Sequence, residues 1–194
     1  MMSAQIVALI ASIVHWKKYK DSTEKYFLFF LIYIVFNEIL GFFIGENNLY
    51  IYNIFTTLSV SFYLFWFYQI LKNKTLIKIF GIIFLVTLIF SIFKQDFWNS
   101  LWVFPFIPYS IIIIICATLF FIDLLKNKNA LNYIDNRKFW IVTGLLVFYI
   151  GFLPISLTWE LIDKGSLPFR IMMILLNIIL YGFFTKGFLC SKQA

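Results

Sequence analysis

Seven stretches of apolar residues, separated by short polar segments, follow one another along this chain of 194 residues. An α-helix needs about 20 residues of this kind to cross the hydrocarbon core of a bilayer. The pattern therefore predicts an all-α fold, a polytopic bundle of seven transmembrane helices that forms one domain over residues 1–194. The approximate spans are 3–16, 26–44, 49–71, 77–93, 101–125, 139–162 and 168–189.

The first stretch departs from the others because it is short and carries Ser3, Gln5 and His15. Positive charge follows it instead of preceding it, which is not the pattern of a cleaved signal peptide. We interpret it as a short span, and a chain of six spans is the alternative.

The connections between the stretches differ in charge. Every Lys and Arg except Lys94, Lys164 and Arg170 falls in alternate connections or at the end of the chain, all on one side of the predicted bundle. Cytoplasmic loops carry an excess of Lys and Arg. We therefore predict an N-terminus outside the cell and a C-terminus in the cytoplasm.

Composition supports a membrane location and removes several classes of function. Hydrophobic residues make up 62% of the chain and charged residues 13%, against about 45–50% and about 25% in soluble domains. The net charge of +7 is spread between apolar stretches, so we expect no nucleic-acid partner. A single histidine and no catalytic or phosphate-binding motif lead us to expect no metal and no cofactor.

Ionisable residues inside a membrane span are costly and are functional candidates by default. Glu38 lies about six residues from the end of its stretch, roughly 9 Å at 1.5 Å per residue, and Asn37 precedes it. Gly41 and Gly45 follow on the same face, where a second helix can approach closely. The functional interpretation is a ligand, ion or proton site open to the outside; the alternative is a protonated Glu in a structural hydrogen bond.

Other polar side chains lie on the same predicted outer side, as do all four prolines, whose broken helix ends often line a cavity. Alternatives are hydrogen bonds to the residue's own helix and plain solvation at the interface. On the inner side, Asp123 is expected to pair with Lys126 or another cytoplasmic lysine. The candidate outer pocket consists of Asn37, Glu38, Asn53, Thr57, Glu160, Arg170 and Asn177.

Three segments resemble small uncharacterised multi-span proteins of Bacteroidota. They are FWIVTGLLVFYIGFLP from Phe139 to Pro154, the pair Asn37-Glu38, and LYIYNIF from Leu49 to Phe55. The resemblance implies a multi-pass protein of the bacterial inner membrane, and it implies no particular activity.

Three functions are compatible with these features. The first is a non-enzymatic sensor or regulatory module that binds a small or lipidic ligand or a membrane partner. The second is a small transporter or channel, and the third is an intramembrane enzyme that acts on lipid. The expected partners are the lipid bilayer and a membrane protein or a second copy of the chain.

Overall fold

The computed structural model describes residues 2–45, 49–98, 100–126 and 130–190, and these ranges contain helices and no strand. Lys128 and Lys192, which contribute to the charge asymmetry, lie outside them. The predicted all-α bundle is confirmed. Its helices are α1 (Met2–Val14), α2 (Lys25–Ile44), α3 (Leu49–Ile70), α4 (Lys74–Lys94), α5 (Phe106–Leu125), α6 (Arg137–Leu157) and α7 (Leu167–Leu189), with 3-10 turns η1 (Trp16–Lys18) and η3 (Ala130–Asp135).

Helix boundaries depart from the apolar stretches mainly beside proline. α5 begins only at Phe106, with Pro105 as its N-cap, because proline has no N–H to donate but suits the start of a helix. α6 ends at Leu157, one turn after Pro154, and the side chain of Thr158 donates to the carbonyl of Pro154. The apolar residues 101–105 and 158–162 are therefore not helical.

Within the described residues, six helices, α2 to α7, are long and apolar enough to cross a membrane. α1 has only 13 residues, which is about 20 Å of helix against about 30 Å of hydrocarbon. The chain is thus a multi-pass membrane protein by the length and composition of these six helices, and α1 is a shorter seventh element.

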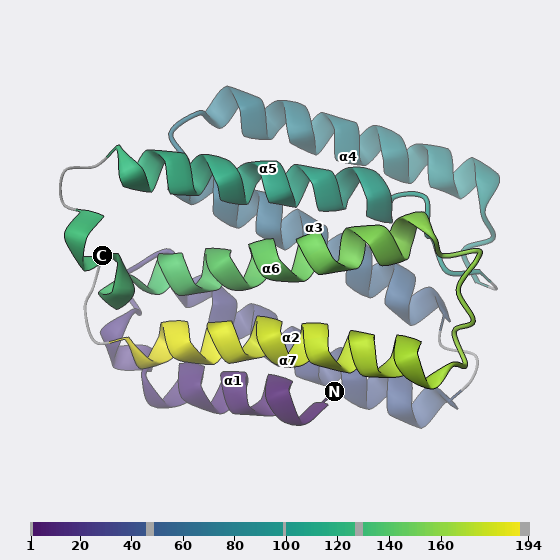
Figure 1. Ribbon diagram of the computed structural model, residues 1–194, viewed down its shortest axis with the longest axis horizontal. Helices are drawn as coiled ribbons and strands as arrows, with labels where there is room; N and C mark the ends of the chain where they lie inside the picture. The colour runs from purple at the N-terminus through teal and green to yellow at the C-terminus, as the bar shows by residue number, and fades with distance from the viewer. Residues whose placement is uncertain (1, 46–48, 99, 127–129, 191–194) are drawn as a thin grey trace.

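The helices are arranged as a ring (Figure 1). α1 packs against α2 and α7, α7 against α6, α6 against α5, and both α5 and α2 against α3; α4 lies outside, against α3 and α5. Aromatic side chains fill the centre. Tyr149 makes edge contacts with Tyr63 and Tyr109, and Phe27 of α2 reaches Phe184 of α7.

Glycines allow α6 and α7 to approach closely. A Cβ on Gly144 would lie 2.7 Å from the Cβ of Phe183 and 3.2 Å from the backbone oxygen of Leu180. Close backbone approach at small residues is a common means of joining helices in membranes. This contact fixes α7 against α6.

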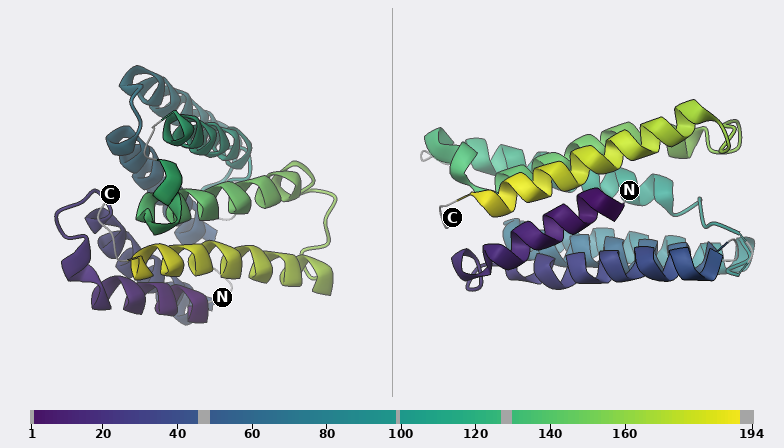
Figure 2. Two further views of the ribbon diagram at one scale, coloured as in Figure 1. Left: turned by 60° about the vertical axis from the view of Figure 1, so that its left-hand side comes forward. Right: turned by 90° about the horizontal axis from the view of Figure 1, so that it is seen from below.

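The two ends of the ring differ because α1 is short. We call the end where α2 begins at Lys25 and α7 ends at Leu189 the lysine end, and the end where α2 ends at Ile44 and α7 begins at Leu167 the proline end. α1 packs between α2 and α7, with its C-terminal end at the lysine end and its N-terminal end part of the way toward the proline end. Beyond this point α2 and α7 diverge (Figure 2). The ring is complete at the lysine end and lacks α1 at the proline end.

Candidate functional site

A polar pair lies at the N-terminal end of α1, in the middle part of the bundle. Gln5, near the start of α1, donates from Nε2 to Oε1 of Glu38 on α2 at 2.9 Å. Gln5 is only 2% exposed, whereas Glu38 is half-buried. The α1–α2 packing therefore places a carboxylate and an amide together at the unfilled part of the ring.

Two tyrosines complete this cluster. Tyr52 of α3 and Tyr181 of α7 lie within electrostatic reach of Glu38, and Gln5 also approaches the hydroxyl of Tyr181. A small surface hollow next to Glu38 is lined by Asn37, Ile51, Tyr52 and Phe55. We call Gln5, Glu38, Tyr52 and Tyr181 the Glu38 cluster; it joins α1, α2, α3 and α7.

The Glu38 cluster has acceptors to offer. Among the described residues, Oε1 of Gln5 is buried and has no hydrogen-bond partner, and the Glu38 carboxylate can accept more than the one bond it has from Gln5. A buried polar atom without a partner costs about 1–3 kcal/mol. The cluster is therefore suited to a ligand that donates hydrogen bonds, such as an amine or a hydroxyl group.

Asn53, a predicted member of the pocket, is 1% exposed and holds the connection between α4 and α5. Its Nδ2 donates to the carbonyls of Phe97 and Ser100 at 2.9 Å each, and its Oδ1 accepts from the N–H of Trp102 at 2.9 Å. These bonds satisfy backbone groups of a non-helical segment inside the protein, which a membrane environment requires.

The remaining predicted residues are placed in other ways. Thr57 donates to the carbonyl of Asn53 and Asn177 to that of Met173, each within its own helix. Glu160 and Arg170 are exposed on either side of the α6–α7 connection. Asn37 donates to the carbonyl of Tyr33, and Asn37 and Glu38 line one hollow together.

The lysine end holds a second polar cluster, which is buried. Arg137 is 1% exposed and Glu24 is 2% exposed. The guanidinium of Arg137 lies 5.1 Å from the centre of the Tyr19 ring, and its Nη2 donates to the carbonyl of Cys190 at 3.2 Å. This contact satisfies a carbonyl at the end of α7 from the start of α6.

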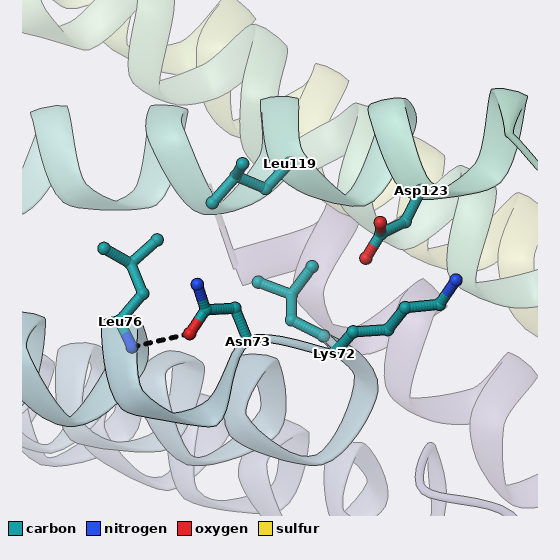
Figure 3. Close-up of a pocket in the computed structure, with 6 residues that line it drawn as sticks. Lys72, Asn73, Leu76, Leu119 and Asp123 are labelled. Atoms are coloured by element: carbon teal, nitrogen blue, oxygen red, sulfur yellow. Dashed lines mark hydrogen bonds between the residues drawn. The ribbon is translucent and has the colours of Figure 1, made fainter.

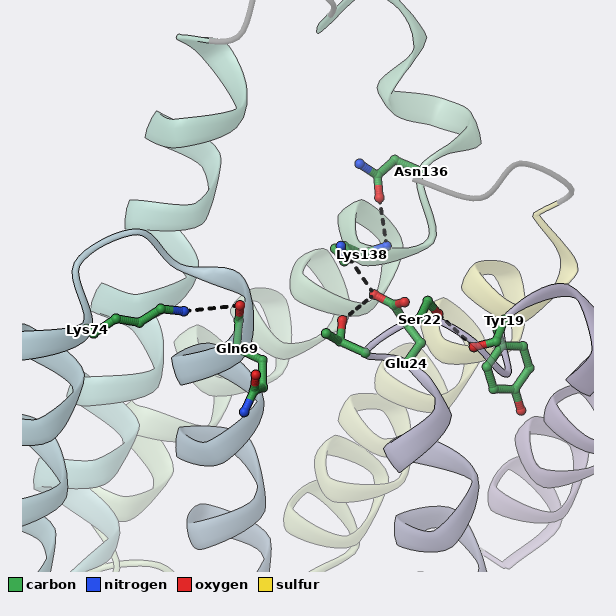
Figure 4. A network of polar contacts seen from close by, with 8 residues as sticks. Tyr19, Ser22, Glu24, Gln69, Lys74, Asn136 and Lys138 are labelled. Carbon is green, nitrogen blue, oxygen red and sulfur yellow. Dashed lines mark hydrogen bonds and ion pairs between the residues drawn. The ribbon is translucent and has the colours of Figure 1, made fainter.

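Further contacts attach the α1–α2 connection to the same cluster (Figure 4). The Tyr19 hydroxyl donates to the carbonyl of Ser12 in α1 at 2.7 Å, and the Glu24 carboxylate lies 4.0 Å from Nζ of Lys138. Asn136 caps α6 by accepting from the N–H of Lys138. We call Tyr19, Glu24, Arg137 and Cys190 the Arg137 cluster.

Burial raises the pKa of Tyr19 and of Cys190, two groups of the Arg137 cluster that lie outside the spans. For the Tyr19 phenol it raises the pKa to about 12, against smaller opposing effects of the Ser12 side chain and of the Arg137 charge. It also raises the pKa of the Cys190 thiol, against the opposing charges of Lys186 and Arg137. Both groups are therefore neutral at physiological pH, and Cys190 has the character of an inert thiol.

The sequence marks Asn37 and Glu38 as candidates and does not indicate which side chains lie beside them. Gln5 interrupts an apolar stretch, and this interruption is the signal that could pair it with Glu38. Arg137 and Glu24 gave no such signal, because charged residues beside a span are ordinary topology markers. Comparisons with protein-family models, with curated proteins and with solved structures give no match.

Proposed function

We propose that this chain is a non-enzymatic sensor or regulatory module of the bacterial inner membrane, whose Glu38 cluster binds a small or lipidic ligand that carries hydrogen-bond donors. The observation that supports the proposal most directly is the Gln5–Glu38 bond, made where α1 stops and α2 and α7 separate (Figure 2). The Glu38 carboxylate is half-buried at this break in the helix ring, and the Gln5 amide oxygen beside it is buried and has no partner among the described residues. A molecule that enters between α2 and α7 and displaces Gln5 would meet both acceptors.

The proposed orientation has the lysine end in the cytoplasm and the proline end outside. The excess of Lys and Arg in the connections at the lysine end supports it. In this orientation α1 extends from the cytoplasmic side over about two thirds of the hydrocarbon thickness, because its 13 residues form about 20 Å of helix. The Glu38 cluster is then open toward the outer leaflet.

α1 provides a physical route from ligand to cytoplasm. It carries Gln5 of the Glu38 cluster near one end and, two turns further on, Ser12, whose carbonyl accepts from Tyr19 of the Arg137 cluster. A helix moves as a rigid body over this length. A ligand that replaces the Gln5–Glu38 bond would shift α1 and thereby disturb Tyr19 against Arg137, which is a change that a cytoplasmic partner can read.

Three lipid probes, each with a single C18 monounsaturated chain and a different polar headgroup, test the proposal. The purified protein is titrated in detergent with oleylamine, 1-oleoylglycerol and oleate, and the unfolding temperature is followed for wild type and Glu38→Gln. We expect the amine and the glycerol to stabilise wild type, oleate to have no effect, and Glu38→Gln to lose the response to the amine.

Glu160→Gln is the matched control, because Glu160 is an exposed carboxylate at the same end; it should respond as wild type. Equal effects of all three lipids, or an unchanged response of Glu38→Gln, would overturn the proposal. Solute flux through proteoliposomes that Glu38→Gln abolishes would replace it with the alternative of a transporter or channel.

A further inference from the structure

A hollow at the lysine end, separate from both polar clusters, lies between the α3–α4 turn and the end of α5 (Figure 3). Lys72 and Asn73 line it from the turn and Asp123 from α5, and Leu71, Leu76 and Leu119 form its apolar wall. We propose that it binds a phosphoethanolamine group, presented as the headgroup of a membrane phospholipid.

The charges in the hollow are opposite but do not neutralise each other directly. Lys72 and Asp123 both line it, yet within the described residues no Lys or Arg nitrogen lies within 4.0 Å of the Asp123 carboxylate. The expected pairing of Asp123 with Lys126 is therefore not formed. An uncompensated cation and anion that face one hollow match a ligand that carries both charges.

The groups on the turn suit a phosphate. Oδ1 of Asn73 accepts from the N–H of Leu76 at 3.1 Å as the N-cap of α4, so the Asn73 amide nitrogen remains to donate. Lys74 is occupied, because its Nζ donates to the carbonyls of Tyr68 and Gln69 at the end of α3. Lys72, the Asn73 amide and the positive end of the α4 dipole therefore surround the place for a phosphate.

Asp123 decides which zwitterion fits. A primary ammonium donates hydrogen bonds to a carboxylate, whereas a trimethylated ammonium has no N–H to donate. Asp123 is only half-exposed, so such a bond is less screened than one in bulk water. An ethanolamine headgroup should therefore be preferred over a choline headgroup.

The position of the hollow favours a lipid as the source. It lies where α3 ends at Ile70 and α4 begins at Lys74, which is the level of lipid headgroups for helices that span a bilayer. α4 packs mainly against α3 and α5, and many of its apolar side chains are exposed, so this side of the bundle faces lipid. Leu76 and Leu119 continue the hollow toward the hydrocarbon and provide contacts for the first acyl carbons.

Native mass spectrometry of the full-length protein in detergent measures this preference, with dioleoyl lipids that carry ethanolamine, choline or glycerol headgroups. Wild type should bind the ethanolamine lipid at least about fivefold tighter than the other two. Asp123→Asn should bind ethanolamine and choline lipids equally, and Lys72→Gln should weaken both. Lys78→Gln is the matched control, because Lys78 is an exposed lysine of α4 outside the hollow.

Equal affinity of wild type for the ethanolamine and choline lipids, or a preference that persists in Asp123→Asn, would overturn the proposal. Soluble glycerophosphoethanolamine separates the two sources of the headgroup. If it binds wild type as tightly as the lipid does, the ligand is a soluble phosphoethanolamine and the lipid assignment is wrong. Weak competition at millimolar concentration, with Asp123→Asn insensitive to it, supports the lipid.

Discussion

The two ends of this bundle use polar residues in opposite ways. At the lysine end, Arg137 and Glu24 are almost fully buried and interact electrostatically, and the Arg137 guanidinium donates to a carbonyl at the end of α7. At the proline end, Glu38 remains half-buried and has one hydrogen bond from a side chain, that of Gln5. The first end is closed by its polar contacts, and the second is left open beside them.

The short α1 explains this difference. Where α1 is present, the ring is complete. The carbonyl of Ser12 in α1 accepts from Tyr19, whose ring lies against the Arg137 guanidinium. Where α1 is absent, α2 and α7 lack a neighbour between them (Figure 2), and Glu38 lies next to this region because it bonds Gln5 near the start of α1. The comparison indicates that a charged residue in a membrane bundle has a structural role where a helix covers it, and that it can bind a ligand where no helix does.

The largest effect should come from removing the charge that closes the lysine end. Arg137→Met leaves the buried Glu24 without the nearby charge of Arg137 and leaves the Cys190 carbonyl without a donor. Breaking a buried ion pair costs about 3–5 kcal/mol, so the unfolding midpoint in detergent should fall sharply. Lys138→Met, which removes a partly exposed lysine 4.0 Å from Glu24, should cost at most about 1 kcal/mol.

If Arg137→Met and Lys138→Met lower the midpoint equally, the Arg137 cluster does not close the lysine end. The double variant Glu24→Gln/Arg137→Met provides a further check. It should recover part of the lost stability, since no uncompensated charge then remains buried.

The next effect tests the α6–α7 contact, which both ends share. Gly144→Ala places a Cβ 2.7 Å from the Cβ of Phe183, and because a Cβ cannot turn away, the helices must separate. Overpacking of this kind costs about 1–3 kcal/mol. Gly182→Ala, at a glycine of α7 with nothing within 4 Å of the added Cβ, should leave the midpoint unchanged or raise it; equal losses for both would contradict close α6–α7 packing.

Much of the fold could be predicted from the sequence, because apolar length alone specifies a helix in lipid. Helices α2 to α4 and α7 begin and end within about three residues of the predicted stretches. The start of α5 and the end of α6 could not be placed, since α5 begins only after Pro105 and α6 ends one turn after Pro154, whereas the apolar run extends further in both cases.

The candidate site was less accessible to sequence reasoning. Glu38 announces itself as a carboxylate inside a span, but its partner Gln5 lies 33 residues away in another helix. Asn53 has the polar character of a pocket residue in the sequence, yet its amide donates to the carbonyls of Phe97 and Ser100. Which side chains meet depends on helix packing, and hydropathy does not encode packing.

A smaller effect on stability is expected at the proline end. Glu38→Gln preserves the shape and can still accept from Gln5, so it should change the unfolding free energy by at most about 1 kcal/mol. The same variant should lose the response to oleylamine. Large destabilisation without loss of ligand response would assign Glu38 to structure, as for Arg137 at the other end, and would remove the contrast between the two ends.

The smallest expected effect is a difference in the rate of cysteine labelling between the two ends, measured in a Cys116→Ala background. Burial raises the pKa of the Cys190 thiol, so less thiolate is present at pH 8 than for an ordinary cysteine of pKa about 8.5. Maleimide labelling of Cys190 should be slow at pH 8 and keep increasing as the pH rises above 9. A cysteine at exposed Lys164, in Lys164→Cys/Cys190→Ala, should label quickly and level off near pH 9.

The same cysteines test the orientation. With a membrane-impermeant maleimide on spheroplasts, the position-164 thiol should react from outside and Cys190 only after permeabilisation; labelling of Cys190 from outside would reverse the proposed orientation.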